Sequence, residues 1–150
     1  MNSLATHLKG YNLVAVDSCI LIYFLEAHPV YGPASKTVMQ MIEKGEVKGM
    51  SSAVAFLEVM VGVYRAKPSH LADKYYALLR EFPRLEWVEL DFEIADQAAQ
   101  IRSQYNVSTP DAIQLATARL GGADALISND RGLARVKGSK VLILDDYCKS

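Results

Sequence analysis

The stretch NLVAVDSCILIYFL, residues 12–25, contains a single carboxylate, Asp17, within a mainly apolar run. Residues 13–16 have the composition of a short buried strand, and residues 20–25 that of a helix that packs back onto a sheet. An unpaired charge among core residues loses hydration worth several kcal/mol. We therefore expect Asp17 to lie where a strand ends, beside a partner that offsets its charge.

Strand-like and helix-like segments alternate along the rest of the chain. The strand-like runs are residues 12–16, 46–50, 85–90, 124–128 and 140–144, and the helix-like runs are residues 33–44, 53–65, 69–80, 92–105 and 110–120. Thr109 is the expected N-cap of the last helix, with Pro110 in its first position. This alternation predicts an α/β fold, with a small, mostly parallel sheet covered on both faces, formed by residues 1–150 as one domain.

The composition is that of an ordinary globular protein. The chain has 150 residues, of which 51% are hydrophobic, and a formal net charge of −1. No apolar run reaches the ~20 residues of a membrane span, and the first residues lack the pattern of a secretory signal. We expect a cytoplasmic protein in which Cys19 and Cys148 are reduced thiols.

The net charge argues against nucleic-acid binding through overall charge, but a local patch remains possible. Residues 131–140 contain four basic residues and no acid; these are Arg131, Arg135, Lys137 and Lys140. They are candidates for weak contacts to RNA phosphates, and the alternative is a solvated basic loop.

Acids follow four of the strand-like runs, at Asp17, Asp91, Asp130 and the pair Asp145 and Asp146. In parallel α/β sheets the binding crevice lies beyond the carboxyl ends of the strands, so each acid is a candidate. Asp91 is well explained as a helix N-cap, and Asp145 and Asp146 as solvated acids near the end of the chain.

Two further acids come from helices. Glu58 is the one charge in a helix that is apolar nearly all round, which is typical of a buried helix, so it needs a cation, an arginine or a water-filled cleft. A lone buried salt bridge is the alternative reading. Asp111 lies in the first turn of its helix, where the helix dipole favours a negative charge whatever the function.

The positions of these acids are best explained if four of them form one group. If Asp17, Glu58, Asp111 and Asp130 meet in one crevice, two of their charges ~5 Å apart repel by ~3 kcal/mol at an effective dielectric near 20. The group must then take up protons or bind cations. Oxygen ligands, with help from the Ser18 and Ser128 hydroxyls, suit Mg²⁺ or Mn²⁺ better than zinc, since the histidines are widely spaced. Acid groups that hold such ions commonly serve phosphodiester hydrolysis.

Four motifs in this order resemble those of the PIN-domain (PilT N-terminus) ribonucleases, and most of all the VapC-type toxins of toxin–antitoxin pairs. The motifs are VAVDSCIL with Asp17, SSAVAFLEVMVG with Glu58, STPDAIQLATA with Asp111, and GADALISND with Asp130. The resemblance spans about residues 13–144. It implies a three-layer α/β/α domain that binds Mg²⁺ or Mn²⁺ and cleaves RNA, and that forms a homodimer inhibited by a cognate antitoxin.

The resemblance also implies residue roles. The metal ligands would be Asp17, Glu58, Asp111 and Asp130. Ser18 and Ser128 would orient these carboxylates, and Asn129 would contact the ligands rather than the metal. Water activated by the metal would attack the phosphorus. Tyr23, Tyr31, Val38, Met39, Tyr75 and Tyr76 are candidates for a dimer or antitoxin contact, or else for core packing.

Two rival functions stay open. The first is a catalytically inactive PIN-like protein that binds RNA or acts as a scaffold. The second is an aspartyl-phosphate phosphatase with Asp17 as nucleophile. Such phosphatases usually carry a second Asp two residues further on, where this chain has Cys19.

Overall fold

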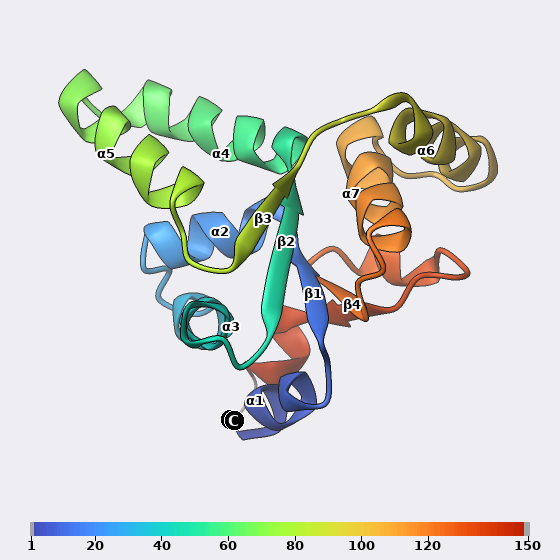
Figure 1. Ribbon diagram of the computed structural model, residues 1–150, viewed down its shortest axis with the longest axis horizontal. Helices are drawn as coiled ribbons and strands as arrows, with labels where there is room; N and C mark the ends of the chain where they lie inside the picture. Colours follow the sequence, from blue (N-terminus) through green and yellow to red (C-terminus); the bar gives the residue numbers. More distant parts are fainter. Residues whose placement is uncertain (1, 149–150) are drawn as a thin grey trace.

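A five-stranded parallel sheet forms the centre of the molecule in the computed structural model, which describes residues 2–148 (Figure 1). The strands lie in the order β3-β2-β1-β4-β5. Their bounds are Leu13–Val16 for β1, Lys48–Ser52 for β2, Leu85–Val88 for β3, Ala125–Ser128 for β4 and Val141–Ile143 for β5. The five predicted strands are confirmed, but β2 begins and ends two residues later than the sequence indicated, and β3 ends two residues earlier.

The order in which the strands are added to the sheet changes direction between β1 and β4, although all the strands are parallel. From β1 it moves outward to β2 and β3, and then crosses back to pair β4 with the other edge of β1. In the register of this pair, Ala15 lies beside Leu126, and Val16 beside Ile127. The carboxyl ends of β1 and β4 therefore meet at the point where ligands bind in open α/β sheets.

Helices cover both faces of the sheet, which gives three α/β/α layers and confirms the predicted fold class (Figure 1). Val14 and Val16 point into one core cluster and Ala15 into the other, as the alternation of a strand requires. The first cluster includes side chains of α1 (Asn2–Lys9), α2 (Ser18–Leu25), α3 (Gly32–Lys44), α4 (Ala53–Ala66) and α5 (Ser69–Arg80). The second includes side chains of α6 (Phe92–Gln104), α7 (Thr109–Leu120) and the 3₁₀ segment η1 (Arg131–Arg135).

Several helix ends differ from the sequence prediction. The N-cap of α7 is Ser108 rather than Thr109, and its side chain accepts from the N–H of Asp111. Asp91 caps α6 as predicted, accepting from the N–H of Ile94 at 2.8 Å. Helix α1 was not predicted, because among its residues 4–9 only Leu4 and Leu8 are buried, and so short an apolar pattern is a weak signal.

The prediction that α4 is a buried helix is wrong. Leu57, Val61 and Tyr64 are 58%, 38% and 61% exposed, and their spacing places them along one side of the helix. A helix that is apolar all round has the same sequence pattern whether its second face packs in a core or is exposed to solvent. The sequence therefore could not distinguish a buried α4 from a partly exposed one. Of the candidate contact residues, Val38 and Met39 are fully buried, whereas Tyr76 is 43% exposed.

Candidate active site

Asp17 lies directly after β1 and caps the N-terminus of α2. Its side chain is held by three hydrogen bonds. Oδ1 accepts from the N–H of Ser18 at 2.8 Å and from Nε2 of Gln114 at 3.1 Å, and Oδ2 accepts from the hydroxyl of Ser128 at 2.7 Å. Only 5% of Asp17 is exposed. Hydrogen bonds to a carboxylate are the strong kind, and they lower the cost of burying it.

Gln114 is a site residue that the sequence reasoning missed. It is 2% exposed and sits in α7, among the buried residues 112–118. Its Nε2 also lies 3.4 Å from the main-chain oxygen of Val16. The available signal was a lone amide in a run of small and apolar side chains, one helical turn after Asp111.

Ser128, the last residue of β4, links two of the acids. Its hydroxyl donates to Asp17 and accepts from the N–H of Asp130 at 3.1 Å, and its side chain is fully buried. Asp130 is exposed and caps the start of η1, where its Oδ1 accepts from the N–H of Gly132 at 2.9 Å. The predicted Asp17 and Asp130 therefore come together through one serine, at the junction of β1 and β4.

Asp111 and Glu58 approach the same place from helices. Burial, and after it the negative charge of Asp17, raises the pKa of the Asp111 carboxyl to about 6, although a hydrogen bond to Ser108 lowers it. The charges of Asp130 and Glu58 add smaller upward shifts to that pKa. The other three predicted acids thus lie within electrostatic range of Asp111.

Glu58 is half-buried on α4 and forms no ion pair with any residue in the part of the chain that the structure describes. The alternative of a lone buried salt bridge is therefore not supported. Ser18 contacts Asp17 through its main-chain N–H.

The donor set suits a hard divalent cation. Its side-chain ligands would be carboxylate and hydroxyl oxygens, which Mg²⁺ and Mn²⁺ prefer. Within residues 2–148, no three acidic, histidine or cysteine side chains already form a group that could hold a metal ion. The negative charges of the neighbouring acids add to burial in raising the pKa of Asp111, but the acids do not form a preformed ligand sphere.

Cys19 does not add a soft ligand to the site. Burial, and to a smaller extent the charge of Asp17, raises the pKa of its thiol to about 12. A thiol with that pKa is protonated at neutral pH, and metals bind the thiolate. Cys19 and Cys148 are both free, as predicted.

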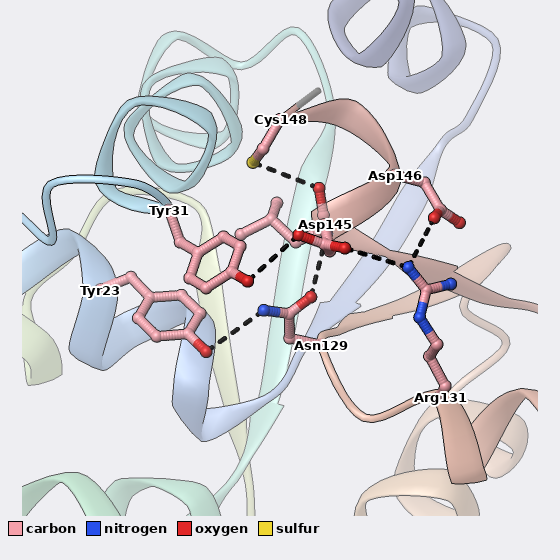
Figure 2. A network of polar contacts seen from close by, with 8 residues as sticks. Tyr23, Tyr31, Asn129, Arg131, Asp145, Asp146 and Cys148 are labelled. Atoms are coloured by element: carbon pink, nitrogen blue, oxygen red, sulfur yellow. Dashed lines mark hydrogen bonds and ion pairs between the residues drawn. The ribbon is translucent and has the colours of Figure 1, made fainter. Parts of the chain in front are cut away.

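The predicted basic patch of residues 131–140 does not form one surface beside the acids. Arg131 pairs with Asp145 and Asp146, at 3.1 and 2.8 Å, so its charge is engaged within the protein and those two acids are more than solvated side chains (Figure 2). Lys140 precedes β5, at the opposite end of the sheet, where its Nζ lies 5.1 Å from the centre of the Tyr11 ring.

The other two basic residues, Lys137 and Arg135, lie on different sides of the molecule. The main-chain oxygen of Lys137 accepts from Arg119, in the last turn of α7, whereas Asp111 is in the first turn of that helix. Lys137 is therefore remote from the acids. Arg135 is exposed on η1. Only Arg131 and Arg135 remain on the side of the molecule where the acids lie.

The fold and the acid group define an α/β domain with its candidate site at the crossover between β1 and β4. Residues 14–139 match the family model described as PIN domain. The chain belongs to the PIN-domain family, which confirms the resemblance seen in the sequence. A comparison with curated proteins finds no match.

Solved structures share the fold over most of both chains. A toxin–antitoxin complex from Klebsiella pneumoniae is 25% identical, with a TM-score of 0.68, over 87% of this chain and 97% of that one. VapBC2 from Rickettsia felis, bound to a DNA fragment from its promoter, is 15% identical with a TM-score of 0.71, over 87% and 98%. VapC20 from Mycobacterium tuberculosis, a toxin that cleaves the sarcin–ricin loop, is 16% identical with a TM-score of 0.62, over 75% and 86%.

In the described part of the chain, no helix is long and apolar enough to cross a membrane.

Proposed function

We propose that this protein is a divalent-metal-dependent endoribonuclease, and that it is the toxin of a type II toxin–antitoxin pair. The observation that carries the proposal is the position of the acids. Asp17 is buried and triply hydrogen-bonded at the β1–β4 crossover, and burial, together with the charges of Asp17, Asp130 and Glu58, raises the pKa of Asp111. Among the described residues no lysine or arginine forms an ion pair with these acids, and a group of acids without such a partner attracts a cation.

The residues that would hold Mg²⁺ or Mn²⁺ are Asp17, Glu58, Asp111 and Asp130. A bound divalent ion would supply positive charge to a phosphodiester and lower the pKa of a water molecule. Such an ion would also lower the repulsion between this acidic site and an anionic RNA.

The chain itself fixes the orientation of the acids. Gln114 and Ser128 hold the two oxygens of Asp17, and Ser128 also holds the main-chain N–H of Asp130. Glu58 lacks such a bond to the described residues and therefore has the most rotational freedom of the group. With a pKa of about 6, the Asp111 carboxyl changes its charge just below neutral pH.

The phosphatase alternative fits the geometry poorly. Both oxygens of Asp17 accept hydrogen bonds from within the protein, and the side chain is almost fully buried. Oδ2 accepts only one hydrogen bond and keeps a lone pair for a metal ion, but a nucleophile must also admit a whole phosphate group to its oxygen, and Asp17 is too buried for that.

Two observations support protein partners. The Klebsiella pneumoniae relative is described as a toxin–antitoxin complex and reaches 25% identity, and by this likeness we propose a cognate antitoxin. The exposed side chains of Leu57, Val61 and Tyr64 on α4 give the apolar surface that a partner or a second copy of the chain needs.

The proposal is tested with purified protein and a panel of tRNA and rRNA fragments in Mg²⁺, Mn²⁺ or chelator. We expect the wild-type protein to cleave RNA only when Mg²⁺ or Mn²⁺ is present. The variants Asp17→Asn and Glu58→Gln should not cleave RNA under any of these conditions. Glu43→Gln, which changes an exposed glutamate on α3, is the matched control and should cleave normally. Full cleavage by Asp17→Asn, or cleavage that chelator leaves unchanged, would contradict the proposal. Chelator-insensitive RNA binding without cleavage would instead favour the inactive PIN-like protein.

A further inference from the structure

The loop that carries Asp130 is fastened on both sides to the 3₁₀ segment η2 (Leu144–Tyr147), near the end of the chain. Before Asp130, the side-chain oxygen of Asn129 accepts from the main-chain N–H of Asp145 at 2.9 Å. After it, Nη2 of Arg131 lies 3.1 Å from Oδ2 of Asp145 and 2.8 Å from Oδ1 of Asp146. Figure 2 shows these contacts converging on Asp145.

Asp145 also connects this loop to the helices on one face of the sheet. Its Oδ1 accepts from the hydroxyl of Tyr31 at 3.1 Å, at the start of α3. The amide of Asn129 donates to the hydroxyl of Tyr23, in α2, at 3.3 Å. The rings of the two tyrosines lie 5.0 Å apart, so both anchor points belong to one packed group (Figure 2).

Several contacts on one carboxylate act together where each alone is weak. The side chains of Arg131 and Asp145 are 56% and 33% exposed, and an isolated ion pair with that exposure adds little to stability. Here, however, one carboxylate receives a tyrosine hydroxyl on one oxygen and a guanidinium on the other, while its main chain holds Asn129. When several hydrogen bonds and ion pairs meet on one residue, they restrict the motion of all the residues involved more than isolated pairs do.

We propose that Asp145 is a positioning residue for Asp130: its carboxylate acts through Arg131, and its main-chain N–H, which Asp145→Ala retains, acts through Asn129. Arg131 then serves to hold the loop rather than to bind RNA phosphate, since two carboxylates already engage it. Asp145 lies beyond residues 14–139, which match the family model, so this support comes from the chain's own last segment. The consequence for cleavage rests on the proposed function, but the restraint on the loop does not.

The restraint is measured by amide hydrogen exchange of the metal-free protein. The N–H groups of Asp130 and Gly132 bond to Ser128 and to the Asp130 side chain, so they report opening of this loop. In Asp145→Ala we expect both amides to exchange about tenfold faster, as for the loss of one charged hydrogen bond. Arg131→Gln should act in the same direction.

The matched control is Asp124→Ala. Asp124 is a carboxylate at the opposite end of the sheet, where its Oδ2 accepts from the N–H groups of Asn12 and Leu13 at 2.7 and 3.0 Å. Its removal costs stability without touching the loop of Asp130. Exchange at Asp130 and Gly132 should therefore stay within twofold of the wild-type rate in this variant. Unchanged exchange in Asp145→Ala, or equal acceleration in both variants, would overturn the proposal.

Cleavage adds a second comparison. If the wild-type protein cleaves RNA, Asp145→Ala should lower kcat and raise the Mn²⁺ concentration needed for half-maximal rate, whereas Asp124→Ala should change neither. A normal kcat and Mn²⁺ requirement in Asp145→Ala would contradict the positioning role. If the wild-type protein cleaves no RNA under any condition, the proposed function fails, while the exchange data still decide whether Asp145 holds the loop.

Discussion

The pKa of Asp111 makes a quantitative prediction about stability. Its carboxyl has a pKa of about 6 in the folded protein against an ordinary value of 3.8, because burial and neighbouring carboxylates disfavour its charge. The folded state therefore holds this proton to a higher pH than the unfolded state does. The contribution of Asp111 to stability is fully present below pH 3.8 and is lost as the pH rises through about 6.

The size of the loss follows from the shift. Moving the pKa from 3.8 to about 6 corresponds to at most ~3 kcal/mol for a fully buried group. Asp111 is only half-buried, so solvent screening reduces the effect, and we expect ~1 kcal/mol between pH 4 and pH 7.5. Asp111→Asn cannot titrate and should escape this loss.

Urea unfolding in chelator at pH 4, 5, 6 and 7.5 measures the effect for both proteins. The free energy of unfolding of Asp111→Asn minus that of the wild type should rise by ~1 kcal/mol across this range, with most of the change complete near pH 6 to 7. Adding Mn²⁺ at pH 7.5 should stabilise the wild type more than the variant. A difference that stays constant with pH would refute the repulsive acid group.

Four other perturbations give distinct outcomes. Ser128→Ala removes the hydroxyl between Asp17 and Asp130, so the free energy of unfolding should fall by about 1–3 kcal/mol in urea melts; no loss would show that water replaces the hydroxyl. Asp17→Asn should also lower stability by about 1 kcal/mol, because an amide cannot accept all three hydrogen bonds, whereas half-buried Glu58→Gln should leave the urea midpoint unchanged. Cys19 should resist iodoacetamide at pH 8 in the native protein and react in urea, as read by mass spectrometry; rapid native labelling would contradict its pKa of about 12.

Much of the fold and the identity of the acids could be read from local patterns. A β-strand, a capping residue and a helix are each decided within a few neighbours, so the sequence correctly indicated β1, the cap at Asp91 and the first turn that holds Asp111. An acid after a parallel strand is likewise placed at the crevice by the chain direction alone. The four sequence motifs that contain Asp17, Glu58, Asp111 and Asp130 resemble those of the PIN family, and the match of residues 14–139 to the PIN domain model confirms that resemblance.

The tertiary structure decided the contacts between distant segments. Asp17 bonds to Gln114 and Ser128, which lie 97 and 111 residues further along the chain, and no local pattern pairs them. The same limit explains the basic segment. The sequence shows Arg131 and Lys140 close together, yet one pairs with Asp145 at the carboxyl end of the sheet and the other lies beside Tyr11 at the amino end.

The sequence by itself therefore determined which residues carry charge and at which strand or helix end each one sits. Only the tertiary structure decided which charges are offset internally and which remain for a ligand. Strand order brings β4 beside β1, and with it Ser128 beside Asp17, while the turn after β5 brings Asp145 to Arg131. The reason is physical: hydrogen bonds and ion pairs depend on distances of about 3 Å in space, which sequence separation does not fix.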